Sequence, residues 1–218
     1  MDDASHDSGN PNDVAEASWN ALTADPAVGV AVIDVTGEIH YANEQIASMF
    51  LGRTGDEIVG HTLFELYPPE WATERVRVFM DILQTGKPAI MRHIRRGVQL
   101  QSAIHAIDTP DDLPPRFLTI THRGQTDADE ERFEVIESEF ANLGPLDKLT
   151  TRELEVLSLI KQGLKLNDIA KLLHRSVKTI DNHRSSIMKK LGVSSRVEMA
   201  KIAEMAGLEM RDAGLRRV

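Results

Sequence analysis

The chain has 218 residues, 41% of them hydrophobic, and a formal net charge of −9, which suits two modest domains, each with its own core. Because it contains no cysteine, disulfides, thiolate metal sites and cysteinyl-flavin photochemistry are excluded. No run of about 18 apolar residues occurs and the acidic first residues lack the order of a signal peptide, so we expect a cytoplasmic protein without a membrane contact.

The charge is divided unevenly along the chain. Residues 1–145 carry 10 Lys and Arg against 25 Asp and Glu, a balance of −15. Residues 146–218 carry 15 against 9, a balance of +6. An acidic segment repels DNA, whereas a basic one is attracted to it. The counts therefore predict that any nucleic-acid-binding module lies in the last third of the chain.

Residues 1–123 are predicted to form a tail followed by an α+β domain. Residues 1–13 are rich in Asp, Asn, Ser and Gly, which predicts a disordered tail. Helices are expected over 14–22, from Asn43 onward and over 71–84. The long one carries an apolar stripe of Val76, Phe79, Met80 and Leu83. β-Branched and alternating patterns predict strands over 28–34, 38–42, 89–95, 98–107 and 116–122.

Several short motifs follow one another in a characteristic order in residues 26–123. A strand ending in Asp-x-x-Gly precedes a strand ending in Asn, short helices with a glycine, one long helix and three strands. The matching residues are Val32, Asp34, Gly37, Ile39, Asn43, Gly60, Gly86 and Pro88. In this order they resemble a PAS sensor domain, here placed at residues 14–123. A phospho-acceptor receiver is disfavoured, because no earlier strand with an acidic pair precedes Asp34 to hold Mg²⁺.

Residues 124–145 are expected to connect the domains as a charged signalling helix. Apolar residues recur there at spacings of 3, 4 and 3, with acidic residues between them: Phe133, Ile136, Phe140 and Leu143. A narrow stripe of this kind is typical of a short coiled coil, which would help a dimer to form, or of a helix docked on a neighbouring sheet. Because the stripe is too short to hold a dimer alone, both interpretations stay open.

Residues 146–205 contain the start and stop signals of several short helices. Thr150 and Glu153 form a capping box, Gly163 ends that first helix, and Ser176 is placed to cap a third. At about 100° per residue, one side of the third helix is apolar, with Ile180, Ile187, Met188 and Leu191. The side expected to contact DNA, including the cap and the flanking positions, comprises Ser176, Lys178, Thr179, Asp181, Asn182, His183, Ser185, Ser186 and Lys189.

These side chains suit a major groove, because Asn can pair with adenine and Lys with guanine or phosphate. Arg184 falls on the buried side of the projection. We therefore expect it to pair with Glu153 or Glu155 of the first helix and to hold the module together.

This segment closely resembles the LuxR/FixJ-type helix-turn-helix domain, a four-helix DNA-binding fold. The residues that carry the resemblance include Leu149, Arg152, Glu153, Gly163, Thr179, Ile180, His183, Arg184, Lys190, Gly192 and Arg196. The resemblance implies base contacts at Asp181, Asn182 and Ser185, and dimerisation through the fourth helix near Val197 and Lys201. Lys165, Leu166 and Arg175 depart from the family pattern, and Asp181 leaves the target sequence open. Residues 206–218 are predicted to be a tail.

Candidate residues for a sensor site come from the expected core of the first domain. A cavity is expected to be lined by Ile39, Met49, Phe50, Phe79 and Ile104. His122 shares a strand face with Leu118 and Ile120, and is therefore expected to point inward as a ligand or core residue. The long helix contains no histidine, so haem is disfavoured. We leave the cofactor and the stimulus undefined and expect no metal site.

The predicted fold class is thus α+β, a PAS-like antiparallel sheet with helices followed by an all-α four-helix helix-turn-helix domain. The expected function is that of a cytoplasmic bacterial transcription regulator, a homodimer that binds double-stranded DNA, contacts RNA polymerase and either senses a small molecule or uses the first domain to dimerise. Asp181 and the negative net charge leave an alternative, a partner that has lost DNA binding and forms heterodimers with other regulators. No constellation of nucleophile and base indicates an enzyme.

Overall fold

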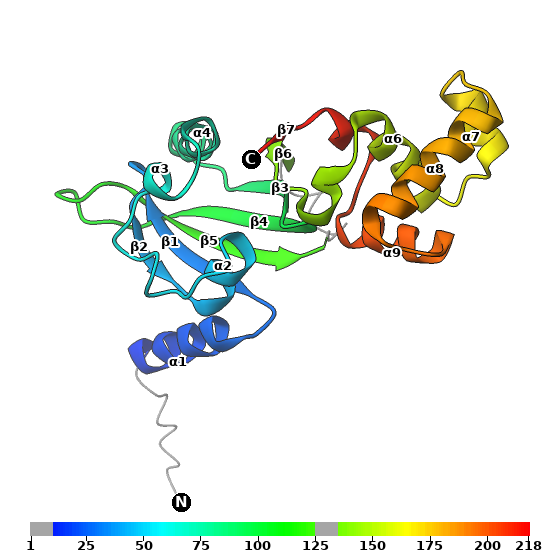
Figure 1. The fold of residues 1–218 in the computed structure, drawn as a ribbon. Helices are drawn as coiled ribbons and strands as arrows, with labels where there is room; N and C mark the ends of the chain where they lie inside the picture. Colours follow the sequence, from blue (N-terminus) through cyan, green and yellow to red (C-terminus); the bar gives the residue numbers. More distant parts are fainter. Residues whose placement is uncertain (1–10, 125–134) are drawn as a thin grey trace, which may run out of the picture.

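The structure is a computed structural model that describes residues 11–124 and 135–218 (Figure 1). Its first part contains α1 Pro11–Ala24, β1 Gly29–Asp34, β2 Ile39–Ala42, α2 Glu44–Phe50, α3 Leu63–Leu66, α4 Pro69–Thr85, β3 Ala89–Arg95, β4 Val98–Ile107, β5 Arg116–Arg123 and β6 Val135–Ala141. The second contains the 3₁₀ helix η1 Gly144–Lys148, α6 Thr151–Lys161, α7 Leu166–Leu172, α8 Val177–Leu191, α9 Arg196–Met205, η2 Met210–Gly214 and β7 Arg216–Arg217. The α+β class is confirmed.

Seven strands form one sheet in the order β2-β1-β5-β4-β3-β6-β7. Its first five members pair antiparallel where they are neighbours, which confirms the sheet expected from the sequence. β6 and β7 extend the sheet beyond β3, and each pairs parallel to its neighbour. Parallel neighbours need a long connection between them, and between β6 and β7 that connection is the helical domain. The sheet is therefore built from segments on both sides of that domain.

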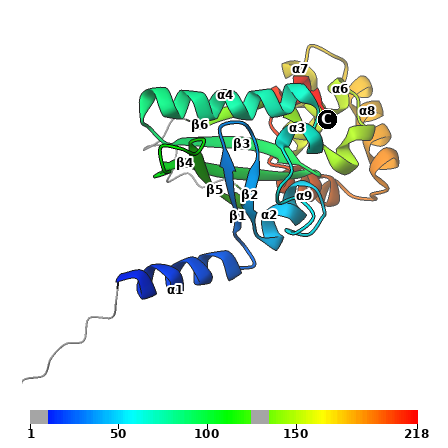
Figure 2. The same ribbon diagram turned by 90° about the vertical axis from the view of Figure 1, so that its left-hand side faces the viewer.

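Helices α2, α3 and α4 cover one face of the sheet, and Figure 2 shows α4 lying along it while α1 stands away from it. The buried side of α4 consists of Trp71, Ala72, Arg75, Val78, Phe79 and Ile82. Of the apolar stripe expected on this helix, Met80 and Leu83 are 54% and 41% exposed. The predicted stripe is therefore rotated around the helix axis relative to the side that is buried. The prediction counted apolar residues only, and so it left out the buried Arg75.

Two hydrophobic cores lie on either side of the junction between the domains. The sensor core includes Ala47, Trp71, Phe79, Met91, Ile104, Phe117 and Phe140. The helical core includes Ile94, Ala141, Leu143, Leu157, Ile160, Ile180, Ile187, Met199 and Ala203. β3 contributes Met91 to the first core and Ile94 to the second, and β6 divides Phe140 and Ala141 in the same way. The two domains therefore share two strands.

The helix expected over residues 124–145 is wrong where the structure describes the segment, because Val135–Ala141 is strand β6. Phe140 is buried in the sensor core and Leu143 in the helical core, so neither is available to a partner chain. Ile136 is half-buried, and Phe133 lies outside the described residues. The segment does dock on its own sheet, but as a strand, because hydrogen bonds to β3 satisfy its backbone.

The tail expected over residues 206–218 is also wrong, and we call these residues the C-terminal segment. Ala206, Leu208 and Asp212 are at most 2% exposed, and Arg216 and Arg217 pair with β6. At the other end of the chain, α1 already begins at Pro11, so residues 11–13 are helical rather than part of a tail. Residues 1–10 lie outside the described residues.

Within residues 11–124 and 135–218, no helix combines the length and the apolar character that a membrane crossing requires.

We predict that Gly207→Ala loosens the junction between the domains. Gly207 has φ +54°, and a Cβ there would lie 1.5 Å from the side-chain oxygen of Gln99 on β4. Gly86 has φ +66° but has nothing within 4 Å of such a Cβ. Gly86→Ala should therefore lose only the left-handed backbone cost of about 1–2 kcal/mol. Gly207→Ala should lose about 1–3 kcal/mol more by overpacking.

Urea denaturation of the two variants measures this difference. Equal losses of unfolding free energy would show that the close contact between Gly207 and Gln99 does not exist in solution.

Candidate functional site

Helices α7 and α8 form a helix-turn-helix at the end of the molecule away from the sheet (Figure 1). Ser176 caps α8, and its hydroxyl accepts a hydrogen bond from the backbone amide of Thr179 at 3.1 Å. His174 in the turn has φ +51°, a left-handed conformation that reverses the chain between the helices. Gly192 ends α8 with φ +69°. The predicted caps of α6 and α8 are thus present, whereas Lys165, the N-cap residue of α7, makes no side-chain capping hydrogen bond.

Most of the candidate DNA-contacting residues lie on the accessible surface of α8. The exposed ones are Ser176, Lys178, Asn182, Ser185 and Lys189, and the half-buried ones are Thr179, Asp181 and His183. Ser186 does not belong to this surface, because its hydroxyl donates to the Glu153 carboxylate at 2.6 Å, and its placement there is corrected. Ile180 and Ile187 are fully buried on the opposite side of the helix.

Arg184 does not pair with Glu153 or Glu155, so that prediction is wrong. Its Nη2 lies 2.8 Å from Asp181 Oδ1, one helical turn earlier, where residues three apart are neighbours. Both side chains are partly exposed, at 38% and 47%. The guanidinium therefore offsets the charge of the one acidic residue among the candidate DNA-contacting positions.

Glu153 joins α6 to α8. Its carboxylate accepts from Ser186 Oγ and Lys190 Nζ, each at 2.6 Å, and from the backbone amide of Thr150 at 2.8 Å. Burial alone would raise the pKa of Glu153, but these hydrogen bonds, the largest from Lys190, outweigh burial and lower the pKa to about 2. The carboxylate is therefore ionised at neutral pH and fixes how α8 stands on α6.

A second candidate site is a cavity of about 60 Å³ between the sheet and α2, α3 and α4. Of the residues expected to line it, Ile39, Phe50, Phe79 and Ile104 do so. Phe79 stacks on Phe117, with ring centroids 4.5 Å apart. Most of the cavity surface is apolar, so a bound molecule would be held mainly by the exclusion of water.

A chain of polar side chains crosses one wall of the cavity. Arg75 Nη2 lies 3.2 Å from His93 Nδ1, His93 Nε2 lies 3.0 Å from Ser102 Oγ, and Ser102 Oγ lies 2.7 Å from Thr121 Oγ1. Burial, reinforced by the guanidinium groups of Arg75 and Arg95, holds the pKa of His93 well below its usual range. A neutral imidazole accepts from Arg75 at Nδ1 and donates from Nε2 to Ser102, which satisfies both ring nitrogens of His93.

The two other expected lining residues do not reach the cavity. Met49 is buried near the end of β3 and the start of β4, where it lines a different hollow. His122 is exposed, because Phe117, Thr119 and Thr121 are the β5 residues buried on the cavity side, and alternation places His122 on the other face. The prediction that His122 points into the core is therefore wrong.

Sequence reasoning missed the residues that give the cavity its polar character. Trp71, Arg75 and Phe79 recur every fourth residue on α4, a signal that appears once a charged residue is allowed in the buried stripe. The Arg75 guanidinium lies 3.6 Å from the centroid of the Trp71 ring. Trp71 Nε1, Arg75 Nε and Thr119 Oγ1 are buried and have no hydrogen-bond partner among the described residues.

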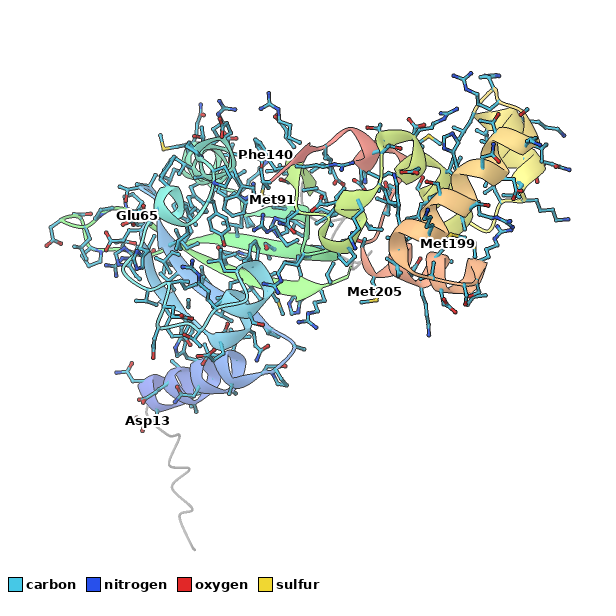
Figure 3. The ribbon with its side chains drawn as sticks, in the orientation of Figure 1. Asp13, Glu65, Met91, Phe140, Met199 and Met205 are labelled. Atoms are coloured by element: carbon cyan, nitrogen blue, oxygen red, sulfur yellow. The ribbon has the colours of Figure 1, made fainter. Side chains whose placement is uncertain are left out.

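The candidate dimerisation residues of the fourth helix are accessible. Val197 is 71% exposed on α9, and Lys201, one turn later, is also exposed. Met205 continues this surface and is 62% exposed, as Figure 3 shows at the end of the helix. Val197 and Met205 therefore present apolar surface to solvent.

Comparison with known proteins identifies both domains. Residues 147–203 match the luxR family of bacterial regulatory proteins, and residues 26–119 match the PAS fold. Over 62 residues, 28% of this chain and 42% of the relative, the sequence is 45% identical to the uncharacterized response regulatory protein YgeK of Escherichia coli (strain K12). Over 123 residues, 52% of this chain and 54% of the relative, it is 30% identical to the oxygen regulatory protein NreC of Staphylococcus aureus (strain JH9).

This chain thus spans about half, or less, of these curated relatives. A solved complex of VqmA from Vibrio cholera with ligand and DNA is similar over 88% of this chain and 90% of that chain, with a TM-score of 0.50 at 18% identity. At this identity the likeness shows a shared fold. Both resemblances inferred from the sequence are confirmed: the chain joins a PAS domain to a LuxR-type helix-turn-helix domain.

We predict that Glu153→Gln destabilises the protein by about 1–3 kcal/mol at pH 7, since it leaves Lys190 and Ser186 with a weaker acceptor. The carboxyl pKa is lowered from 4.5 to about 2 in the folded chain. Its contribution is therefore complete above pH 4.5 and is lost as the pH falls toward 2.

Denaturation between pH 7 and pH 2 should show the difference between wild type and E153Q shrinking over that range. Glu204→Gln, at an exposed position on α9, is the matched control and should give a small, constant difference. A difference for E153Q that does not vary with pH would contradict the role given to this carboxylate.

Proposed function

We propose that this chain, in which a PAS domain precedes a LuxR-type DNA-binding domain, is a transcription regulator that binds double-stranded DNA through α8. The observation that carries the proposal is the accessible surface formed by Lys178, Asn182, Ser185 and Lys189. It lies on a helix-turn-helix, at the end of the molecule away from the acidic domain, in a segment with a balance of +6. The VqmA complex, a similar fold solved with ligand and DNA, supports the proposal.

We propose that different side chains on this surface contact the phosphates and the bases of DNA. Lys178 and Lys189 lie about three turns apart on α8 and are proposed to contact phosphates on either side of the groove. Asn182 is placed for a base edge between them, where a bidentate pair with adenine discriminates by about 1–3 kcal/mol. Asp181, offset by Arg184, can approach the groove as an acceptor for the cytosine amino group.

The alternative function, a heterodimerising partner that has lost DNA binding, is weakened by the Arg184–Asp181 ion pair and by the distribution of charge along the chain. It rests on Asp181 and on the negative net charge. Arg184 offsets Asp181 at 2.8 Å, and the negative charge lies in residues 1–145.

We further propose that the protein acts as a homodimer. Val197 and Lys201 lie on the accessible face of α9, next to the exposed Met205. Two copies joined there would present two α8 helices to successive major grooves of a two-fold symmetric site.

The PAS cavity is proposed as the sensor site, for a small and largely apolar molecule that carries hydrogen-bond acceptors. Its walls are mostly apolar. Trp71 Nε1, Arg75 Nε and Thr119 Oγ1, which have no hydrogen-bond partner within residues 11–124 and 135–218, can each donate. An acceptor on the ligand would satisfy groups that are otherwise costly to bury. About 60 Å³ holds only a few water-sized groups, so the ligand must be small.

We predict that binding to a random-sequence duplex weakens steeply with salt, and that Lys178→Ala reduces the slope of log K against log salt concentration by about 1. Lys87→Ala removes an exposed lysine from the acidic domain and is the control, with no expected change in slope. Fluorescence anisotropy over about a fourfold range of salt concentration, from roughly 50 to 200 mM, measures the slopes of the wild type and of both variants. A flat wild-type titration would refute DNA binding, and equal slopes for the two variants would refute the assignment of Lys178.

We predict that freshly purified wild-type protein retains a small molecule, seen as an added mass by native mass spectrometry, and that Ala31→Leu does not. Ala31 is 3% exposed and lines the cavity, so three added carbons would occupy the ligand space. Ala106→Leu, at an exposed position on β4, is the matched control and should retain the molecule. A wild-type protein without added mass would contradict the proposed sensor site, as would retention by A31L.

A further inference from the structure

Strand β3 has one face in the sensor cavity and the other toward the helical domain. Met91 and His93 line the cavity. Arg92, between them, points to the opposite face, because successive side chains of a strand alternate. Ile94 follows on that face and belongs to the helical core. A displacement of β3 at the cavity must therefore also displace the groups that contact the helical domain.

The Arg92 guanidinium is bound to the C-terminal segment by buried contacts. Its nitrogens donate to both Asp212 oxygens at 3.0 and 2.9 Å, to the Gly207 carbonyl at 2.9 Å and to Glu137 on β6 at 2.8 Å. The side chains of Arg92 and Asp212 are only 3% and 2% exposed. Burial lowers the pKa of Arg92, but its bonds to Asp212 and Glu137 outweigh burial and raise the pKa above its ordinary range.

The rest of the C-terminal segment ties the two domains together. Arg217 donates to the carbonyls of Asp147 and Leu149, just before α6, at 2.7 Å each. The Val218 amide donates to the Ala141 carbonyl at 3.1 Å, and Asn142 Nδ2 donates to the Val218 carbonyl at 2.7 Å. The segment therefore contacts β3 through Arg92. Figure 1 shows the chain leaving α9 and ending beside β6.

We propose that Arg92 is a positioning residue that couples the cavity to the DNA-binding domain: a change at Met91 and His93 is transmitted through β3 and the Arg92–Asp212 pair to the C-terminal segment. The inference rests on the proposed function, since it takes the cavity as the input and α8 as the output. A buried, bidentate ion pair is sensitive to small displacements because its hydrogen bonds need narrow ranges of distance and angle. Figure 3 shows Met91 and Phe140 on the two strands shared by the domains.

The first test is hydrogen–deuterium exchange on the full chain, with the cavity altered by mutation. Met91→Ala enlarges the cavity on β3, whereas Ile39→Ala, the matched control, enlarges it on β2 at the far edge of the sheet. Met91 and Ile39 are 1% and 4% exposed, so both variants lose a buried side chain. We expect M91A to speed exchange in peptides covering residues 206–218 by about tenfold relative to I39A. Equal exchange in the two variants would overturn the proposal.

The second test is a mutant cycle on affinity for a random-sequence duplex. R92M/D212N removes the ion pair but leaves no unpaired buried charge at Asp212, which favours a folded protein. We expect M91A to change the dissociation constant by at least about threefold in the wild-type background and not to change it in the R92M/D212N background. Arg211→Ala is the control: it removes a more exposed arginine of the C-terminal segment, with its ion pairs to Glu137 on β6 and to Glu209, and should preserve the M91A effect.

The same M91A effect in R92M/D212N as in wild type would overturn the proposal, and thermal unfolding of each variant checks that it is folded. If the wild-type chain binds no DNA, the proposed function fails. The exchange experiment still tests the coupling, because it requires no DNA.

Discussion

The structure depends on the way β3 serves two hydrophobic cores at once. A central strand with both faces buried usually has apolar residues throughout, yet β3 carries Arg92 toward the helical domain and His93 toward the cavity. An uncompensated buried guanidinium would cost several kcal/mol, roughly as much as the protein's whole margin of stability. Asp212 and the Gly207 carbonyl compensate it, and both come from the end of the chain. The sensor sheet is therefore complete only when the helical domain has returned the C-terminal segment to it.

Glu153 has the same role within the helical domain on a smaller scale. Because Lys190 and Ser186 occupy its carboxylate, α8 is fixed on α6 by charge as well as by its apolar side. Arg184 is then left to neutralise Asp181 on the surface. Two sides of α8 thus have different roles. The groups that hold α8 in place face α6, and the groups proposed to contact DNA face solvent.

The polar chain in the cavity wall illustrates how a PAS core can tolerate buried charge. Arg75 is balanced by its ion pair with Glu74 and by the Trp71 ring. Burial, reinforced by Arg75, lowers the pKa of His93 and keeps it neutral. The three cavity donors that have no partner in the described part of the chain line a mostly apolar space. In the proposed sensor role, the shape of the cavity would select the size of a ligand and the donors its polarity, and β3 would transmit the change to the other domain.

Local signals in the sequence determined the five antiparallel strands, the long helix and the helix-turn-helix with its caps, because glycine turns, capping boxes and apolar periodicity act over a few residues. The same signals identified the exposed surface of α8 and four cavity residues, among them Phe79 and Ile104. They did not determine what depends on partners distant in sequence. The 3-4-3 spacing around Phe140 fitted a helix, but its backbone is satisfied by β3, some 45 residues earlier, as in the Arg92–Glu137 contact. Only tertiary structure decided that the last 13 residues complete the sheet, since a buried arginine on β3 needs a carboxylate that arrives 120 residues later.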